Sequence, residues 1–276
     1  MTTNTRGLKN KDDQGWGATR SLGDTSRRGH ALATTWQALW IQQLYRVFLG
    51  RSAKAVELLR HQGQLAAGLD PAKLARALAE SREGRTLTVQ GLYRRYLGRS
   101  ADPVGLTHYR KALAGGRTRV QIERDLLVSA EYAAVQGGTL PGWLRGLYQD
   151  VHGRAPDAAG FQYFAHDLAH DEHSKAAVAL VFLDSHERRE GWVRACFVEV
   201  LGRSPAPNEL SSWVRSLAAG ADLDEIRYGL AASLVTPDAC LGPRLGSSPH
   251  AVKKTSAAAT RSSRSPWGSR CRAKPA

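Results

Sequence analysis

The stretch that decides the fold is TVQGLYRRYLGRS, residues 88–100, because three other segments of the chain repeat its pattern. These segments are WIQQLYRVFLGRS (40–52), WLRGLYQDVHGRA (143–155) and WVRACFVEVLGRS (192–204). Their arginines are spaced by 48, 55 and 49 residues. Apolar side chains recur at the same offsets, spaced as i, i+1, i+4, i+5, i+8 and i+9, which is one face of an amphipathic helix. The chain therefore contains an internal repeat, whose members we number copies one to four along the sequence.

The pattern continues beyond each Gly-Arg pair. The glycine is expected to end the first helix in a left-handed conformation. Six residues after each arginine come Glu57-Leu58, Gly105-Leu106, Gly160-Phe161 and Glu209-Leu210, and an aromatic residue or His follows three residues later. This pattern predicts a second helix, and Pro103 and Pro207 suit its first turn. A third helix begins near Asp70-Pro71 in copy one and near Asp222 in copy four. It is expected to close at a serine 30 or 31 residues after the arginine, namely at Ser81, Ser129, Ser185 and Ser233.

The predicted fold is all-α, with four tandem three-helix repeats of about 50 residues that form a helical array. The array is either a solenoid or two packed pairs of repeats. Strand signals are sparse by comparison. The predicted boundaries are a disordered N-terminal tail (1–35), repeats at 36–84, 86–135, 141–189 and 190–238, and a basic disordered C-terminal tail (241–276).

The Gly-Arg pairs form the structural signature of the repeat: Gly50, Arg51, Gly98, Arg99, Gly153, Arg154, Gly202 and Arg203. Such arginines could form a ladder that reads a phosphate or an acidic peptide. They could equally bond helix-terminal carbonyls or a carboxylate such as Glu83, Glu131 or Glu187. The structural role is favoured, because a repeat that needs its own internal geometry also keeps such a residue.

Positive charge is concentrated in the tails. The chain has a net charge of +14, of which residues 1–35 contribute +3 and residues 241–276 contribute +8, so the middle holds only +3. A Ser-, Ala- and Arg-rich tail without apolar periodicity cannot bury enough surface to order itself. It either has no specific partner or contacts a polyanion such as a phosphate backbone or anionic lipid. The cations for that contact are Lys253, Lys254, Arg261, Arg264, Arg270 and Arg272.

No catalytic, cofactor or metal site is predicted. The densest group of metal-ligating side chains runs from His166 to His173, with His166 and His170 one helical turn apart, but it falls at a helix end and is interpreted as solvated. Asp102 and Asp157 each supply one carboxylate, which suits a helix N-cap better than a calcium site. Three scattered cysteines give neither a disulfide framework nor a zinc motif. Neither G-x-S-x-G nor a phosphate-binding loop is present, so no enzyme is expected.

The chain resembles a repeated bacterial domain, domain of unknown function 4214. Copy two carries the resemblance best, in Leu92-Tyr93, Leu97-Gly98-Arg99, Asp102, Gly105-Leu106, Tyr109 and Ser129-Ala130-Glu131-Tyr132. Copies one and four lack the Asp and the following Gly. The resemblance, over about residues 36–237, implies an all-helical domain, often attached to secreted or surface-associated bacterial proteins and distantly similar to the phycobilisome linker domain.

These features favour a non-enzymatic scaffold or surface-adhesion and assembly module that binds protein partners. The alternative is a nucleic-acid or polyanion binder that uses the basic C-terminal tail. No membrane-spanning segment and no N-terminal signal peptide are found, so the cytoplasm is the default expectation, with secretion by another route open.

Overall fold

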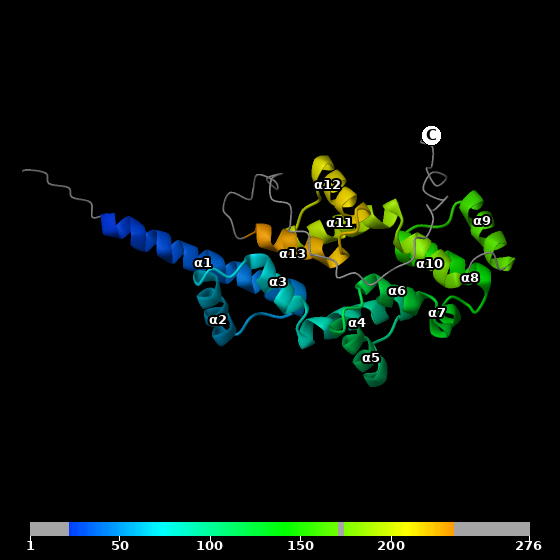
Figure 1. The fold of residues 1–276 in the computed structure, drawn as a ribbon, viewed down its shortest axis with the longest axis horizontal. Coiled ribbons are helices and arrows are strands. Elements are labelled where there is room, and N and C mark those ends of the chain that lie inside the picture. The colour runs from blue at the N-terminus through cyan, green and yellow to red at the C-terminus, as the bar shows by residue number, and fades with distance from the viewer. Residues whose placement is uncertain (1–21, 171–173, 235–276) are drawn as a thin grey trace, which may run out of the picture.

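The computed structural model describes residues 22–170 and 174–234, which form thirteen α-helices, one π-helical segment and no strand (Figure 1). The predicted all-α class is confirmed. Copy one contains α1 (Leu22–Leu49), α2 (Ala55–Ala66) and α3 (Pro71–Ala79). Copy two contains α4 (Arg82–Leu97), α5 (Pro103–Ala114) and α6 (Arg119–Leu127). Copy three, counted here from the end of α6 rather than from residue 141, contains α7 (Ala130–Val135), α8 (Leu140–Leu147), η1 (Tyr148–His152), α9 (Ala158–Ala169) and α10 (Lys175–Leu183). Copy four contains α11 (His186–Leu201), α12 (Pro207–Ala218) and α13 (Leu223–Ser233).

Three of the four recurring serines begin helices, and the fourth, Ser233, is the last residue of α13. Helices α3, α6 and α10 end before Ser81, Ser129 and Ser185, whose side chains accept the N–H of the residue three positions further on. Each serine is therefore the N-cap of the next helix. The predicted boundaries at 84/86 and 189/190 consequently cut through α4 and α11, because the cap belongs to the helix that follows it.

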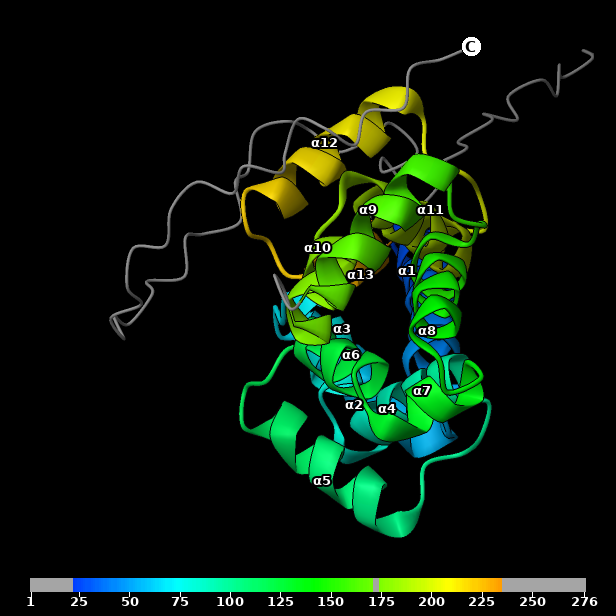
Figure 2. The ribbon, with the colours of Figure 1, turned by 90° about the vertical axis from the view of Figure 1, so that its right-hand side faces the viewer.

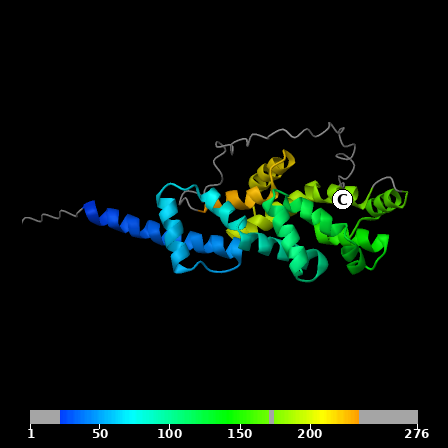
Figure 3. The ribbon, with the colours of Figure 1, turned by 60° about the horizontal axis from the view of Figure 1, so that its bottom comes forward.

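The predicted N-terminal boundary also falls too late. Helix α1 begins at Leu22, so residues 22–35, which the sequence pattern assigns to the tail, continue this helix beyond the body (Figure 3). Adding a residue to an existing helix costs much less free energy than starting a new helix. Residues 22–35 can therefore extend the packed part of α1 without an apolar stripe of their own. Residues 1–21 and the C-terminal tail, including the six cations proposed for polyanion contact, lie outside the described residues.

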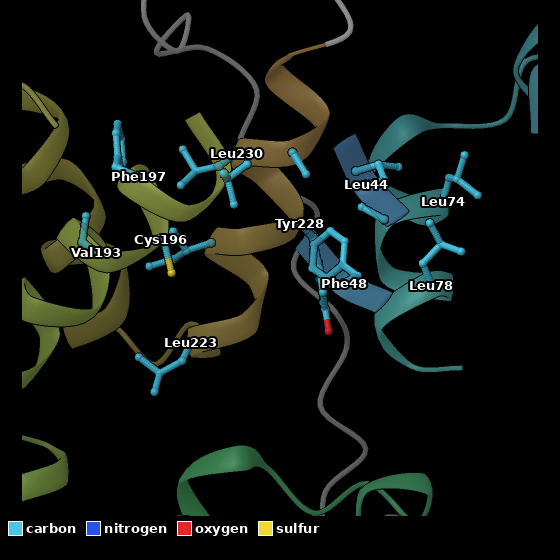
Figure 4. Packing of buried hydrophobic residues seen from close by; sticks show 14 of the residues in the cluster. Leu44, Phe48, Leu74, Leu78, Val193, Cys196, Phe197, Leu223, Tyr228 and Leu230 are labelled. Atoms are coloured by element: carbon cyan, nitrogen blue, oxygen red, sulfur yellow. The ribbon is translucent and has the colours of Figure 1, made fainter. Parts of the chain in front are cut away.

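Two hydrophobic cores hold the copies in pairs. The first core joins copies one and four, and the second joins copies two and three. In the first core, Phe48 of copy one lies against Tyr228 of copy four, with ring centres 5.9 Å apart (Figure 4). Third helices pack across each pair, α3 against α13 and α6 against α10. Of the two arrangements open from the sequence, the structure has packed pairs.

The chain must double back between copies two and three, because copy three packs on copy two and copy four on copy one. The longest arginine spacing, 55 residues, falls at this junction. The extra residues form the short helix α7 and a turn at Gly137 and Gly138, whose φ angles are +84° and +69°. Two consecutive left-handed residues are a conformation that glycine adopts without strain.

The second helices are peripheral. Each packs mainly on the first helix of its own copy, as α2 does on α1 and α5 on α4. In two perpendicular views, α2 and α5 lie on one side of the elongated body, and α9 and α12 lie on the opposite side (Figures 1 and 2). None of the helices in the described ranges is long and apolar enough to cross a membrane.

Candidate functional site

The Gly-Arg turns have one geometry in all four copies. Each glycine follows a first helix and has a left-handed backbone, with φ of +63° at Gly50, +67° at Gly98, +74° at Gly153 and +67° at Gly202. This conformation ends the helix and reverses the chain toward the second helix. The arginine that follows is thereby brought back over the end of the helix it has just left.

Each arginine makes the same local contacts. Its Nη1 donates to the carbonyl oxygen of the next residue, over 2.9–3.2 Å in the four copies. The guanidinium carbon lies 5.0–5.3 Å from the centre of the aromatic ring six positions earlier, a cation–π distance. The rings are Tyr45, Tyr93, Tyr148 and Phe197.

In copies one to three, the arginine also bonds the first helix of the next copy. Nε and Nη2 of Arg51 donate to the two carboxylate oxygens of Glu83, at 2.6 and 3.0 Å. Arg99 bonds Glu131 in the same two-pronged way, and Arg154 bonds Glu187. These glutamates stand two residues after the capping serines. The Gly-Arg turn and the Ser-x-Glu cap are thus two halves of one joint between consecutive copies.

The second helix begins in two alternative ways. In copies two and three, Asp102 and Asp157 cap it by accepting backbone N–H bonds, 3.5 and 3.6 Å from the copy's own arginine. In copies one and four, Lys54 and Ala206 stand at the position of that Asp, and a glutamate three residues further along the chain caps the helix instead. Glu57 and Glu209 each accept the backbone N–H three residues earlier and a two-pronged bond from the arginine.

A Tyr-Gly pairing explains this alternation, and the sequence analysis missed it. A Cβ on Gly105 would lie 2.2 Å from the Tyr93 hydroxyl, and one on Gly160 would lie 2.5 Å from that of Tyr148, so both positions require glycine. Copy four has Phe197 without a hydroxyl and accommodates Glu209. In copy one, the Tyr45 hydroxyl bonds His61 instead, which leaves room for Glu57.

The arginines keep their partner carboxylates ionised. Hydrogen bonds from Arg51 lower the pKa of the Glu57 carboxyl to about 2 and also lower the pKa of Glu83. The pKa values of Glu131, Glu187 and Glu209 are likewise lowered, each chiefly by its arginine. The recurrent arginines are therefore engaged with groups of their own chain, which is the arrangement that a structural role requires.

The histidine group is only partly described. The rings of His166 and His170 lie 4.2 Å apart at the end of α9 and are exposed, whereas Asp167 between them is buried. Residues 171–173 fall in the gap between the described ranges. Within those ranges, no group of three or more His, Cys, Asp or Glu side chains could hold a metal ion. Cys196 is buried in the first core, and burial raises the pKa of its thiol to about 12, so it is a hydrophobic side chain here.

The turns, caps and glycines just described are most regular in copies two and three, and the family comparison selects the same two copies. Residues 88–136 and 142–192 match the family model "Domain of unknown function (DUF4214)". The two matched domains contain the Asp-capped joints with Tyr93 and Tyr148. No curated protein and no solved structure matches the chain.

Proposed function

We propose that this protein is a non-enzymatic helical-repeat scaffold that binds protein partners through its peripheral second helices. The observation that carries the proposal is the outward apolar surface of α2 and α5. Val56 and Leu59 on α2 are 77% and 70% exposed, and Val104 on α5 is 79% exposed. Large exposed apolar side chains on protruding helices are typical of surfaces that bind a partner.

The internal contacts support the same proposal. The polar side chains that recur in the copies, Arg99 and Glu131 for example, bond each other and hold consecutive copies together. We take copies one and four to be diverged members of the same repeat, because their Gly-Arg turns have the geometry seen in the two matched domains. A bacterial surface-adhesion or assembly role, and the distant similarity to the phycobilisome linker domain, belong to this proposal.

The test compares two triple variants of the full chain with the same added charge. In one, Val56, Leu59 and Val104 are replaced by lysine. In the matched control, lysine replaces Ala66, Ala67 and Ala114, which are exposed at the ends of the same two helices. Partners captured from the organism's own extract are compared at low and high salt. Capture by the wild type and the control should survive high salt, and the apolar variant should lose it. Equal capture by both variants would refute docking through α2 and α5.

The alternative function is polyanion binding through the C-terminal tail. It is favoured by the eight Lys/Arg and no Asp/Glu in residues 241–276. The salt arm of the same experiment separates the two, because binding that neutralises phosphates weakens steeply as salt rises whereas apolar docking does not.

A further inference from the structure

Two exposed histidines form a pair at the end of α9, and neither the joints between copies nor the proposed docking surface uses them. His166 is in the last turn of α9 and His170 follows its last residue, where the His170 backbone N–H donates to the His166 carbonyl oxygen at 3.1 Å. The two side chains therefore stand one helical turn apart on the same face. The sequence pattern alone favours a solvated helix end here, and the structure adds that the two ring centres are only 4.2 Å apart.

This distance is close to the one that a shared metal ion requires. A bond from a metal ion to an imidazole nitrogen is about 2.0–2.1 Å long, so two imidazoles bound at right angles have ring centres about 4.5 Å apart, and two in a tetrahedral site about 5 Å apart. The observed distance is nearer to the right-angled arrangement. Both side chains are exposed, so each ring can rotate about its Cβ–Cγ bond to turn one nitrogen toward the ion.

The surroundings of the pair favour a cation. The carbonyl groups at the C-terminal end of a helix carry a partial negative charge, and both histidines stand at such an end. Helix α9 itself contains no Lys or Arg whose charge would repel the ion.

We propose that His166 and His170 together bind a divalent transition-metal ion, with copper(II) and nickel(II) preferred over zinc(II). Imidazole is a ligand for all three ions, and right-angled geometry is typical of tetragonal copper(II) and nickel(II). Two protein ligands leave the other positions of the ion open for water or for a group of a binding partner. The pair lies on the side of the body opposite α2 and α5, so the inference does not depend on the proposed docking surface (Figures 1 and 2).

The test titrates the full chain with nickel(II) after its accessible thiols have been alkylated, and measures binding by calorimetry. The single variants His166→Gln and His170→Gln are compared with the wild type and with a matched control that carries both His108→Gln and His186→Gln. His108 and His186 are exposed, and each is the only histidine of its helix. Circular dichroism of each variant checks that the fold is retained.

Each single variant should lose the tightest nickel(II) site. The affinity should fall at least about tenfold, since loss of a mere outer-shell partner of a metal ligand already costs about 10–100-fold. The control should bind nickel(II) as the wild type does. Excess calcium or magnesium should not displace nickel(II), because these ions prefer oxygen ligands. Displacement by calcium would show that carboxylates form the site and would refute the proposal.

Three other results would overturn the proposal. If the two histidines bind metal separately, each single variant loses one of two equivalent sites and keeps the affinity of the other. Equal losses in the control and in the single variants would assign the binding to isolated surface imidazoles. A loss in His173→Gln, with His166→Gln and His170→Gln both unaffected, would assign it to residues 171–173, which lie outside the described ranges.

Discussion

His152 departs from its repeat. The other copies have Leu49, Leu97 and Leu201 at the same position, the last of the first helix. The imidazole stacks on Phe182, with ring centres 4.9 Å apart and planes 14° from parallel, and its Nε2 lies 3.0 Å from the Ser185 hydroxyl. Burial lowers the pKa of His152, an effect that Glu187 only partly offsets.

We predict that this histidine makes the protein less stable in mild acid. Above pH 6.5, the ordinary pKa of histidine, the ring is neutral in both states and contributes no pH dependence. As the pH falls below this value, the unfolded chain takes up a proton that the folded state resists, so the free energy of unfolding decreases down to the lowered folded pKa. His152→Leu should remove this decrease. Urea unfolding of both proteins at pH 7.5 and 5.5 checks it, and an equal loss in both would assign the pH dependence to other groups.

A second prediction concerns the arginine of the joint. Arg99→Ala removes the two-pronged bond to Glu131, the bond to the Ser100 carbonyl and the packing against the Tyr93 ring. The melting temperature should fall below that of Arg94→Ala, which removes an exposed arginine that has no ion pair with any described residue. An unchanged melting temperature together with a failure to bind partner or polyanion would instead show that Arg99 binds a ligand.

Among the helices, the first helix of each copy could be predicted from its apolar stripe, whereas its subdivision in copy three could not. The pattern of residues 143–152 is that of the other copies, yet the structure has α8 followed by the π-helical η1, and the additional helix α7 before them. Asp150 of η1 accepts hydrogen bonds from Tyr132 and Gln136, which α7 and its end place there. The π-helical segment η1 therefore depends on contacts with the inserted residues of α7, which the local periodicity of residues 143–152 does not encode.

The end of the first helix gives a paired prediction. Gly98 has φ of +67°, where a β-branched residue is strained, so Gly98→Val should lower the free energy of unfolding by about 1–2 kcal/mol. Gly91 lies inside α4, and a methyl group added to it would meet nothing within 4 Å, so Gly91→Ala should raise it by about 0.5–1 kcal/mol. Chemical denaturation measures both. The same sign for both variants would mean that the left-handed turn is not what requires glycine at position 98.

Over the whole molecule, the two cores are joined by a buried ion pair. Nη2 of Arg188 on α11 lies 3.2 Å from a carboxylate oxygen of Glu123 on α6, and both side chains are almost fully buried. Arg119 also bonds Glu123, and both arginines lie against the Trp192 ring, at 4.5 and 5.1 Å. Copy two of one core is thereby tied to copy four of the other.

Glu123→Ala should destabilise the protein by about 3–5 kcal/mol, because it leaves Arg188 buried without its counter-charge. The double variant Glu123→Leu with Arg188→Leu should recover most of this loss, since it removes both charges together. Urea unfolding of the wild type, the single variant and the double variant checks this. If Glu123→Ala unfolds at the wild-type midpoint, the pair does not hold the two cores together.

The sequence by itself determined the helical class, the left-handed glycine turns and the Asp caps of copies two and three, because each depends on residues within about one helical turn of one another. The repeat period followed from finding the same local pattern at intervals along the chain. The sequence also contains the alternation between a Tyr-Gly pair and a glutamate cap. Its reason became clear only from the structure, in which the tyrosine hydroxyl occupies the space that a Cβ at the glycine would need. The pairing of copies, one with four and two with three, was decided by tertiary structure. The apolar stripes of the four copies are alike, so any copy could pack on any other, and the reversal at Gly137-Gly138 selects the partner.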